Sequence, residues 1–147
     1  MNRQDENTPV FSIGSAARLL GVSVQTLRSY EAEGLILPEK STGGQRRYSR
    51  ADIERLECVR HAITEQKIGI AGIRHMQSLV PCWQIVNCTP EERHRCPAFR
   101  NHDGGCWTYH HLNNACASRD CRLCEVYRLS TTCAGIKQII QISTDQK

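Results

Sequence analysis

Residues 11–50 read FSIGSAARLLGVSVQTLRSYEAEGLILPEKSTGGQRRYSR, and this stretch decides the fold of the N-terminal part of the chain. Apolar residues recur at helical spacing on both sides of Gly21, which predicts two short amphipathic helices joined by a glycine turn. Ser12 and Ser23 stand where these helices should begin, as N-cap residues whose hydroxyls accept from the first free backbone N–H groups. The pattern predicts a helix-turn-helix, a motif that places its second helix in the DNA major groove.

A hairpin and further helices are expected after this motif. Leu35–Leu37 should begin a strand, Gly43–Gly44 should bend the chain, and Arg46–Tyr48 should form the return strand. Ser49-Arg-Ala-Asp52 resembles a capping box and predicts a third helix, and a short fourth helix should end at Pro81. The fold class that we predict is therefore mainly α, a winged helix-turn-helix of four helices plus a β-hairpin wing.

The second helix should present polar side chains outward. Val24 and Leu27 fall on one side, so that Gln25, Thr26 and Arg28 point away from the first helix. Glutamine and arginine carry paired groups that match adenine and guanine edges, although Arg28 could equally clamp a phosphate.

Other polar groups near this helix suit the DNA backbone. Tyr30 can bury its ring and offer its hydroxyl to a phosphate. Arg46 and Arg47 lie in a local run of cations without an acid, which suits backbone or minor-groove contact.

These residues closely resemble the N-terminal domain of the MerR family of bacterial transcription regulators, over roughly residues 11–79. The matching motifs are Phe11-Ser-Ile-Gly, Val22-Ser-x-x-Thr26-Leu-Arg28-x-Tyr30-Glu31-x-x-Gly34-Leu35 and Gly44-x-Arg46-Arg47-Tyr48, and Gly69-Ile-Ala-Gly-Ile73 is similar to the branch with heat-shock repressors. The resemblance implies double-stranded promoter or operator DNA, a homodimer and RNA polymerase as partners. It also implies DNA contacts by Thr26, Arg28, Tyr30, Arg46, Arg47 and Tyr48.

One departure from this family concerns dimerisation. Family members commonly continue into a long helix that pairs in a dimer, whereas Pro81 and Cys82 follow here. A dimer must then use another surface, either the cysteine-rich segment or the stripe of Ile136, Ile139 and Ile140.

Composition divides the chain of 147 residues, because eight of its nine cysteines lie within residues 82–133. The net charge of +4 alone would not predict a nucleic-acid partner.

The polar N-terminus lacks a secretion signal, and no window approaches the roughly 18 apolar residues that span a bilayer. We expect no membrane association and a cytoplasmic location at the bacterial nucleoid, where clustered cysteines hold metal more often than disulfides. The expected domains are a disordered lead (1–10), the DNA-binding domain (11–80), a cysteine-rich module (81–133) and a short terminal helix or tail (134–147).

The cysteine-rich module contains an imperfect repeat. Each half opens with Cys-Trp and closes with Cys-x-x-aromatic, and the whole resembles a paired Cys-Trp module found in bacterial signalling proteins. A segment this small seldom folds on its apolar core alone, which favours a metal or cluster as its support. The candidate ligands are Cys82, Cys88, Cys96, Cys106, Cys116, Cys121, Cys124 and Cys133.

Spacing leaves the identity of the metal open. Structural zinc prefers Cys-x2-4-Cys pairs, which only Cys116, Cys121 and Cys124 provide. With Cys133, the same residues follow an iron–sulfur spacing of Cys-x4-Cys-x2-Cys…Cys, and we predict that these four share one centre. The cofactor is therefore an iron–sulfur cluster or zinc, and a thiol–disulfide switch or a sensor of free metal is the remaining alternative.

The sequence contains no Ser/His/Asp set, no phosphate-binding glycine loop and no nucleophile beside an evident base, so we expect no enzyme. The favoured function is a sequence-specific transcription regulator that responds to redox state or metal through the cysteine-rich module. One alternative is a regulator whose zinc-held module serves structure or protein interaction without sensing. A less favoured alternative is a redox carrier.

Overall fold

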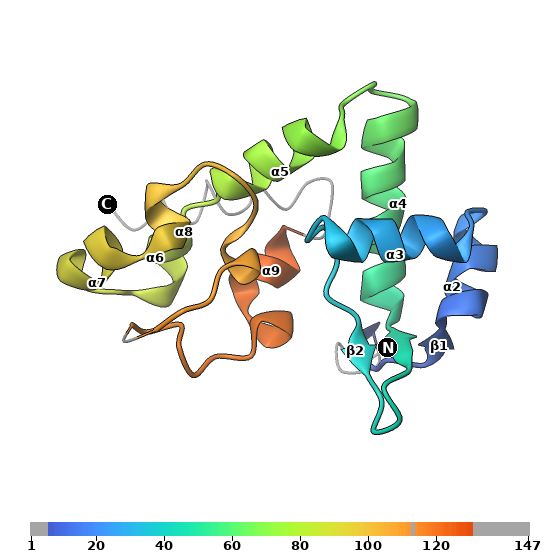
Figure 1. Cartoon of the computed structure of the whole chain (residues 1–147), viewed down its shortest axis with the longest axis horizontal. Coiled ribbons are helices and arrows are strands. Elements are labelled where there is room, and N and C mark those ends of the chain that lie inside the picture. The colour runs from blue at the N-terminus through green and yellow to red at the C-terminus, as the bar shows by residue number, and fades with distance from the viewer. Residues whose placement is uncertain (1–5, 113, 131–147) are drawn as a thin grey trace. The chain divides into compact units, whose positions relative to one another are not determined.

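The computed structural model describes residues 6–112 and 114–130 (Figure 1). The chain forms two compact units, Met1–Lys67 and Ile68–Lys147. The terminal helix expected over residues 134–147 lies outside the described residues, as do residues 1–5 of the expected lead and Cys133.

The first unit is a helix-turn-helix with a small sheet. Its elements are β1 (Phe11–Ser12), α2 (Ile13–Leu20), α3 (Val24–Ala32), β2 (Glu39–Lys40), β3 (Arg46–Tyr48) and α4 (Arg50–Thr64). The strands are antiparallel in the order β1-β3-β2, with Phe11 opposite Tyr48 and Lys40 opposite Arg46. The predicted winged helix-turn-helix and its mainly helical class are confirmed.

Serine caps begin the helices as predicted. The Ser12 and Ser23 hydroxyls accept hydrogen bonds from the backbone N–H groups of Ser15 and Thr26. Gly21 ends α2 at φ 66°, a left-handed conformation that glycine adopts without a steric penalty. These local interactions fix where α2 and α3 begin and how sharply the chain turns between them.

The strand predicted at Leu35–Leu37 is wrong, because the first wing strand begins only at Glu39. Leu35 and Ile36 are both fully buried, whereas neighbouring residues of a strand point to opposite faces. The Leu35 carbonyl accepts from Arg55 Nε at 2.6 Å, and this buried arginine of α4 thereby holds the loop. Burial of two successive apolar residues therefore produces a packed loop here.

Helix α4 begins with the predicted capping box. The Ser49 hydroxyl accepts from the Asp52 N–H at 3.1 Å, and the Asp52 carboxylate accepts from the Ser49 N–H at 2.8 Å. Leu56 of α4 is fully buried, as are Leu27 of α3 and Tyr48 of β3. Ala16 of α2 is fully buried as well, so the core of this unit lies between α2, α3, α4 and the sheet.

The second unit consists of short helices. They are α5 (Ile70–Ser78), α6 (Cys82–Val86), α7 (Pro90–Arg95), α8 (Pro97–Arg100), η1 (Cys106–Thr108), η2 (Cys121–Leu123) and α9 (Glu125–Leu129). Within residues 6–112 and 114–130, no helix combines the length and the apolar character that crossing a membrane requires.

Helix α5 contacts the cysteine-rich module. Arg74 pairs with Asp103 at 3.1 Å, and the Arg74 carbonyl accepts from the Gly104 N–H at 3.2 Å. His75 Nδ1 lies 3.2 Å from the His102 carbonyl oxygen. These bonds explain why the division into units falls after Lys67, ahead of this helix.

Candidate DNA interface and cysteine-rich module

The exposed face of α3 carries Gln25 and Arg28, one helical turn apart. Between them on the opposite side lies Leu27, which is fully buried and anchors the helix. A helix held by one apolar stripe presents its polar side chains at fixed positions, as direct readout of base edges needs.

Two further predicted contact residues of α3 lie partly inside the unit. Thr26 is half-buried and its hydroxyl lies 2.9 Å from the Ser23 hydroxyl, so it also takes part in the helix cap. Tyr30 is buried, with 8% of its surface exposed, as predicted for its ring.

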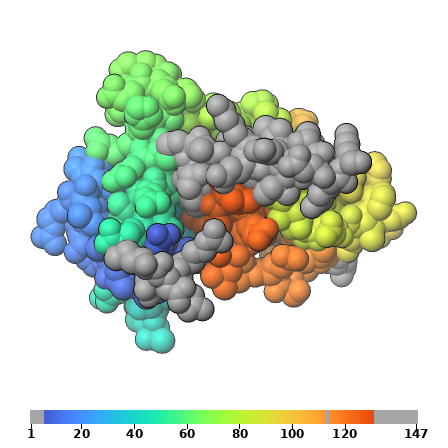
Figure 2. Space-filling view, turned by 180° about the vertical axis from the view of Figure 1, so that it is seen from behind, coloured from blue at the N-terminus to red at the C-terminus, as the bar shows by residue number. Residues whose placement is uncertain are grey.

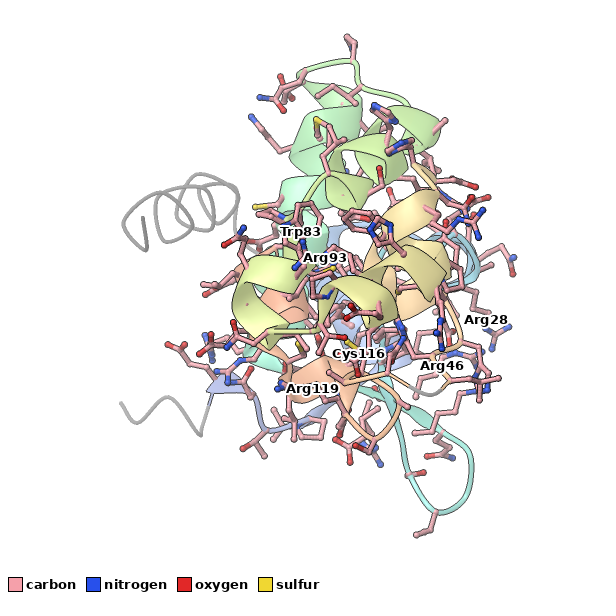
Figure 3. The ribbon with its side chains drawn as sticks, turned by 90° about the vertical axis from the view of Figure 1, so that its left-hand side faces the viewer. Arg28, Arg46, Trp83, Arg93, Cys116 and Arg119 are labelled. Carbon is pink, nitrogen blue, oxygen red and sulfur yellow. The ribbon has the colours of Figure 1, made fainter. Side chains whose placement is uncertain are left out.

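The wing is joined to α3 by an ion pair. Arg46 of β3 donates through Nε to the Glu31 carboxylate of α3, and this hydrogen bond raises the pKa of Arg46. Burial raises the pKa of Tyr48, and Arg46 and Arg28 both lie near enough to oppose part of that rise; Figure 3 labels both arginines. Together with the half-buried Arg47, they form a positive group on α3 and β3.

The tip of the wing protrudes from the surface in Figure 2. The turn is closed by bonds from the Ser41 N–H to the Gln45 carbonyl at 2.8 Å and from the Gly44 N–H to the Ser41 carbonyl at 2.9 Å. Gly44 has φ 78°, and the residues from Thr42 to Gln45 are exposed. This hairpin has the shape and exposure of a wing that follows a DNA backbone.

Tyr48 differs from its expected position at the interface, because it is fully buried. Burial is the main cause that raises its pKa to about 12, and the Glu31 carboxylate adds to it. Its hydroxyl has no hydrogen-bond partner among the described residues. In this conformation Tyr48 belongs to the core, where β3 packs against α2, and its predicted contact with DNA stays a prediction.

The repeat in the cysteine-rich module appears as repeated geometry. Trp83 packs edge-on against Phe99 with ring centroids 5.1 Å apart, and Trp107 packs in the same way against Tyr127 at 5.2 Å. Cys96 and Cys124 precede α8 and α9 with the same extended backbone.

Glycine and arginine support these aromatic pairs. A Cβ on Gly105 would lie 2.3 Å from the Trp107 ring, so any larger residue at this position would clash with the ring where it now lies. The Arg93 guanidinium carbon lies 5.9 Å from the Trp83 centroid and 5.8 Å from that of Phe99, within cation–π range. The roles of Arg93 and Glu31 were not predicted from the sequence, since no spacing rule identifies a long-range partner.

The cysteines that open the two halves meet. A hydrogen bond joins the Cys82 and Cys106 side chains, which lowers the pKa of Cys82 and raises that of Cys106. Burial raises the pKa of Cys116 to about 11, and the nearby Cys82 adds to this effect. Each of these thiols is partly buried and free.

The other candidate ligands are distributed around two small enclosed spaces. Cys82, Cys88, Cys96 and Cys116 line one, and Cys106, Cys116, Cys121 and Cys124 line the other. His111 lines both, with Nδ1 3.7 Å from the Cys96 sulfur. Yet no three Cys, His, Asp or Glu side chains in the described part of the chain are arranged to hold a metal ion. The predicted centre of Cys116, Cys121, Cys124 and Cys133 stays a prediction.

Capped helices, a tight glycine turn and a hairpin wing define a winged helix-turn-helix of the DNA-binding class. Residues 11–79 match the family of MerR HTH family regulatory proteins, so this part of the chain is a MerR-family domain.

Several curated relatives are similar to part of this chain, among them the following. The putative heat shock protein HspR of Streptomyces coelicolor is 43% identical over 74 residues, which cover 50% of this chain and 49% of the relative. The HTH-type transcriptional regulator TnrA of Bacillus subtilis is 51% identical over 47 residues, 32% of this chain and 43% of the relative. A mercuric resistance operon regulatory protein of Pseudomonas fluorescens is 38% identical over 68 residues, 46% of this chain and 45% of the relative. The chain spans about half the length of these curated relatives or less.

Proposed function

We propose that this chain is a sequence-specific transcription regulator that binds double-stranded operator DNA through α3 and the β2–β3 wing. The observation that carries the proposal is the exposed Gln25 and Arg28 face of α3 beside Arg46 and Arg47 of β3. The family match and the regulatory names of the relatives support it.

Glu31 has a positioning role in this interface. Its carboxylate holds Arg46, a residue of the wing, against the helix that reads the bases. An ion pair of this kind orients the arginine, while the remaining guanidinium N–H groups are available to a phosphate. Binding then requires α3 and the wing to act as one surface.

The DNA-bound form that we propose is a homodimer. One winged module buries only roughly 600–1,000 Å² of protein surface on DNA, which is small for tight specific binding. Two-fold pairing on a palindromic or near-palindromic site is the usual solution, and RNA polymerase is the further partner expected at a promoter.

The cysteine-rich module is proposed as the responsive part of the regulator. Its loop at residues 102–104 is bonded to α5, and α5 follows the DNA-binding unit directly in the chain. Bound iron–sulfur cluster or zinc would hold the module through its cysteines and make its structure depend on metal supply or oxidation.

Selection from a random duplex pool tests DNA binding. The full chain should enrich a motif with two symmetric half-sites, whereas an Arg28→Ala/Arg47→Ala variant should enrich none. Lys67→Ala is the matched control, because it removes one exposed cation outside α3 and the wing. Enrichment of the same motif by the double variant would contradict the proposed interface, and a motif of one half-site with a monomer in light scattering would contradict the dimer.

Metal analysis of anaerobically purified protein tests the cofactor. Visible absorption with bound iron supports a cluster, and a colourless protein with stoichiometric zinc supports a scaffold. A protein that folds without bound iron or zinc would contradict both the iron–sulfur and the zinc proposal.

A further inference from the structure

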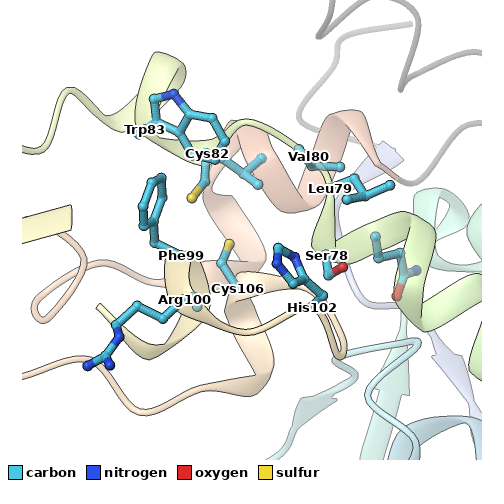
Figure 4. Close-up of a pocket in the computed structure, with 12 residues that line it drawn as sticks. Ser78, Leu79, Val80, Cys82, Trp83, Phe99, Arg100, His102 and Cys106 are labelled. Carbon is cyan, nitrogen blue, oxygen red and sulfur yellow. The ribbon is translucent and has the colours of Figure 1, made fainter. Parts of the chain in front are cut away.

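Two thiols from distant parts of the repeat face each other in the second unit. Cys82 opens α6 and Cys106 opens η1, so they hold equivalent positions in the two halves. Their side chains are joined by a hydrogen bond, and Figure 4 shows the two sulfur atoms pointing toward one another. Contact between thiols is the starting geometry for disulfide formation.

These thiols line a cavity of about 510 Å³ (Figure 4). Its walls are largely apolar and include Leu79, Val80, Trp83 and Phe99. The cavity volume falls within the range of small-molecule sites, and walls of this kind favour a ligand with an apolar body.

One polar group in the wall lacks a partner. Gln77 is 7% exposed and lines the cavity, and its side-chain oxygen has no hydrogen-bond partner among the described residues. A buried acceptor of this kind favours a ligand that carries an O–H or N–H donor. The cavity therefore combines an apolar wall, an unused acceptor and two adjacent thiols.

We propose that Cys82 and Cys106 form a reversible intramolecular disulfide when an organic hydroperoxide enters this cavity. The apolar substituent of the hydroperoxide would contact the wall, and its terminal O–H would donate to the Gln77 oxygen. This chemistry is independent of DNA binding, although its regulatory consequence rests on the proposed function.

The reaction balances without a further reagent. The Cys82 sulfur, having lost its proton, attacks the terminal oxygen of the hydroperoxide, so that an S–O bond forms and the O–O bond breaks. The alcohol leaves after taking up that proton, and Cys82 is left as a sulfenic acid. The Cys106 sulfur then attacks the Cys82 sulfur, the S–S bond forms, and the hydroxyl leaves as water with the Cys106 proton. Two thiols are oxidised, and one hydroperoxide is reduced to an alcohol and water.

Peptide mapping of the full chain tests this reaction. Reduced protein is treated with cumene hydroperoxide, remaining thiols are blocked with N-ethylmaleimide, and tryptic peptides are analysed by mass spectrometry. Cys82 lies in the peptide 75–93 and Cys106 in 101–119, which also contain Cys88 and Cys116. A Cys88→Ser/Cys116→Ser variant leaves one cysteine in each peptide, so a cross-link between them identifies the pair.

The expected result is a cross-link of 75–93 to 101–119 in the wild type and in Cys88→Ser/Cys116→Ser, reversed by dithiothreitol. Cys82→Ser and Cys106→Ser should each abolish it. At equal concentration, cumene hydroperoxide should act at least about tenfold faster than hydrogen peroxide, because only the former has an apolar group to bury.

Three results would overturn the proposal. One is a cross-link that persists in Cys82→Ser, and another is an equal rate with both peroxides. The third is protection of Cys82 and Cys106 from N-ethylmaleimide in purified protein until a chelator removes a bound metal, since these thiols would then be ligands. Fragmentation of the wild-type peptides locates the bond even if a serine variant does not fold, and DNA binding affects none of these readouts.

Discussion

Replacing Arg28 with alanine tests DNA recognition without disturbing the fold of the first unit. Arg28 is exposed on α3, while its neighbour Leu27 is fully buried and holds the helix. Alanine favours the helical conformation, and a surface substitution of this kind changes the free energy of unfolding by about 0.5 kcal/mol or less. Arg28→Ala should therefore leave the fold intact.

The loss in operator affinity follows from the contact that the side chain makes. A bidentate arginine–guanine contact contributes roughly 1–3 kcal/mol, and about 1.4 kcal/mol corresponds to a tenfold change in Kd. Arg28→Ala should therefore weaken binding to the operator about 5- to 150-fold, while binding to unrelated duplexes changes much less. If Arg28 instead holds a phosphate, affinity should fall to a similar extent on every sequence, and the salt dependence should become shallower.

Fluorescence anisotropy titrations of labelled operator and scrambled duplexes at several salt concentrations distinguish these outcomes. Lys67→Ala, which also removes a positive charge, should retain the affinity of the wild type. Operator affinity that is unchanged in both Arg28→Ala and Arg47→Ala would refute the assignment of α3 and the wing as the DNA interface.

Further substitutions test the core, the repeat and the coupling between them. Leu56→Ala should lower the free energy of unfolding by about 2–5 kcal/mol in denaturant titration, since Leu56 is fully buried, whereas the exposed Glu57→Ala should leave it nearly unchanged. Gly105→Ala should destabilise the second unit by about 1–3 kcal/mol and shift Trp107 fluorescence to longer wavelength, because the new Cβ would lie 2.3 Å from that ring. Gly43→Ala is its control, with the nearest atom at 3.9 Å; equal spectra for both variants would contradict the close approach. Oxidation by cumene hydroperoxide should change operator affinity about 5- to 150-fold in the wild type and not in Cys82→Ser, and equal affinities of reduced and oxidised wild type would make the module a structural appendage.

Local signals in the sequence predicted the first unit well. Ser12, Ser23 and Ser49 act within one helical turn of themselves, so their positions in the sequence were sufficient to place three helix starts. Leu35 and Ile36 misled the strand prediction, because the buried Arg55 that bonds the Leu35 carbonyl comes from α4, far along the chain. The sequence therefore predicted the short-range helix caps but not the long-range partner, Arg55.

The second unit shows the same limit for its candidate site. The Cys-Trp repeat predicted two similar halves, and the pairs Trp83–Phe99 and Trp107–Tyr127 have matching geometry. Cysteine spacing, however, grouped residues that are close in sequence, whereas the thiols in contact are Cys82 and Cys106. Equivalent positions in a repeat can meet only when the two halves pack together, and spacing rules for single loops carry no such information.

Helix α5 connects the DNA-binding unit to the cysteine-rich module. The family match runs to residue 79 and includes it, yet its bonds through Arg74 and His75 go to the loop that leads to Cys106. Cys82 follows this helix closely, and its N–H donates to the Val80 carbonyl at 2.8 Å. Both thiols of the proposed switch are thus attached to α5, one through the chain and one through the loop at residues 102–104. A disulfide between them would close a covalent ring over residues 82–106, and the Arg74–Asp103 ion pair attaches that ring to α5. A change in the ring would therefore act on the segment joined directly to the DNA-binding unit.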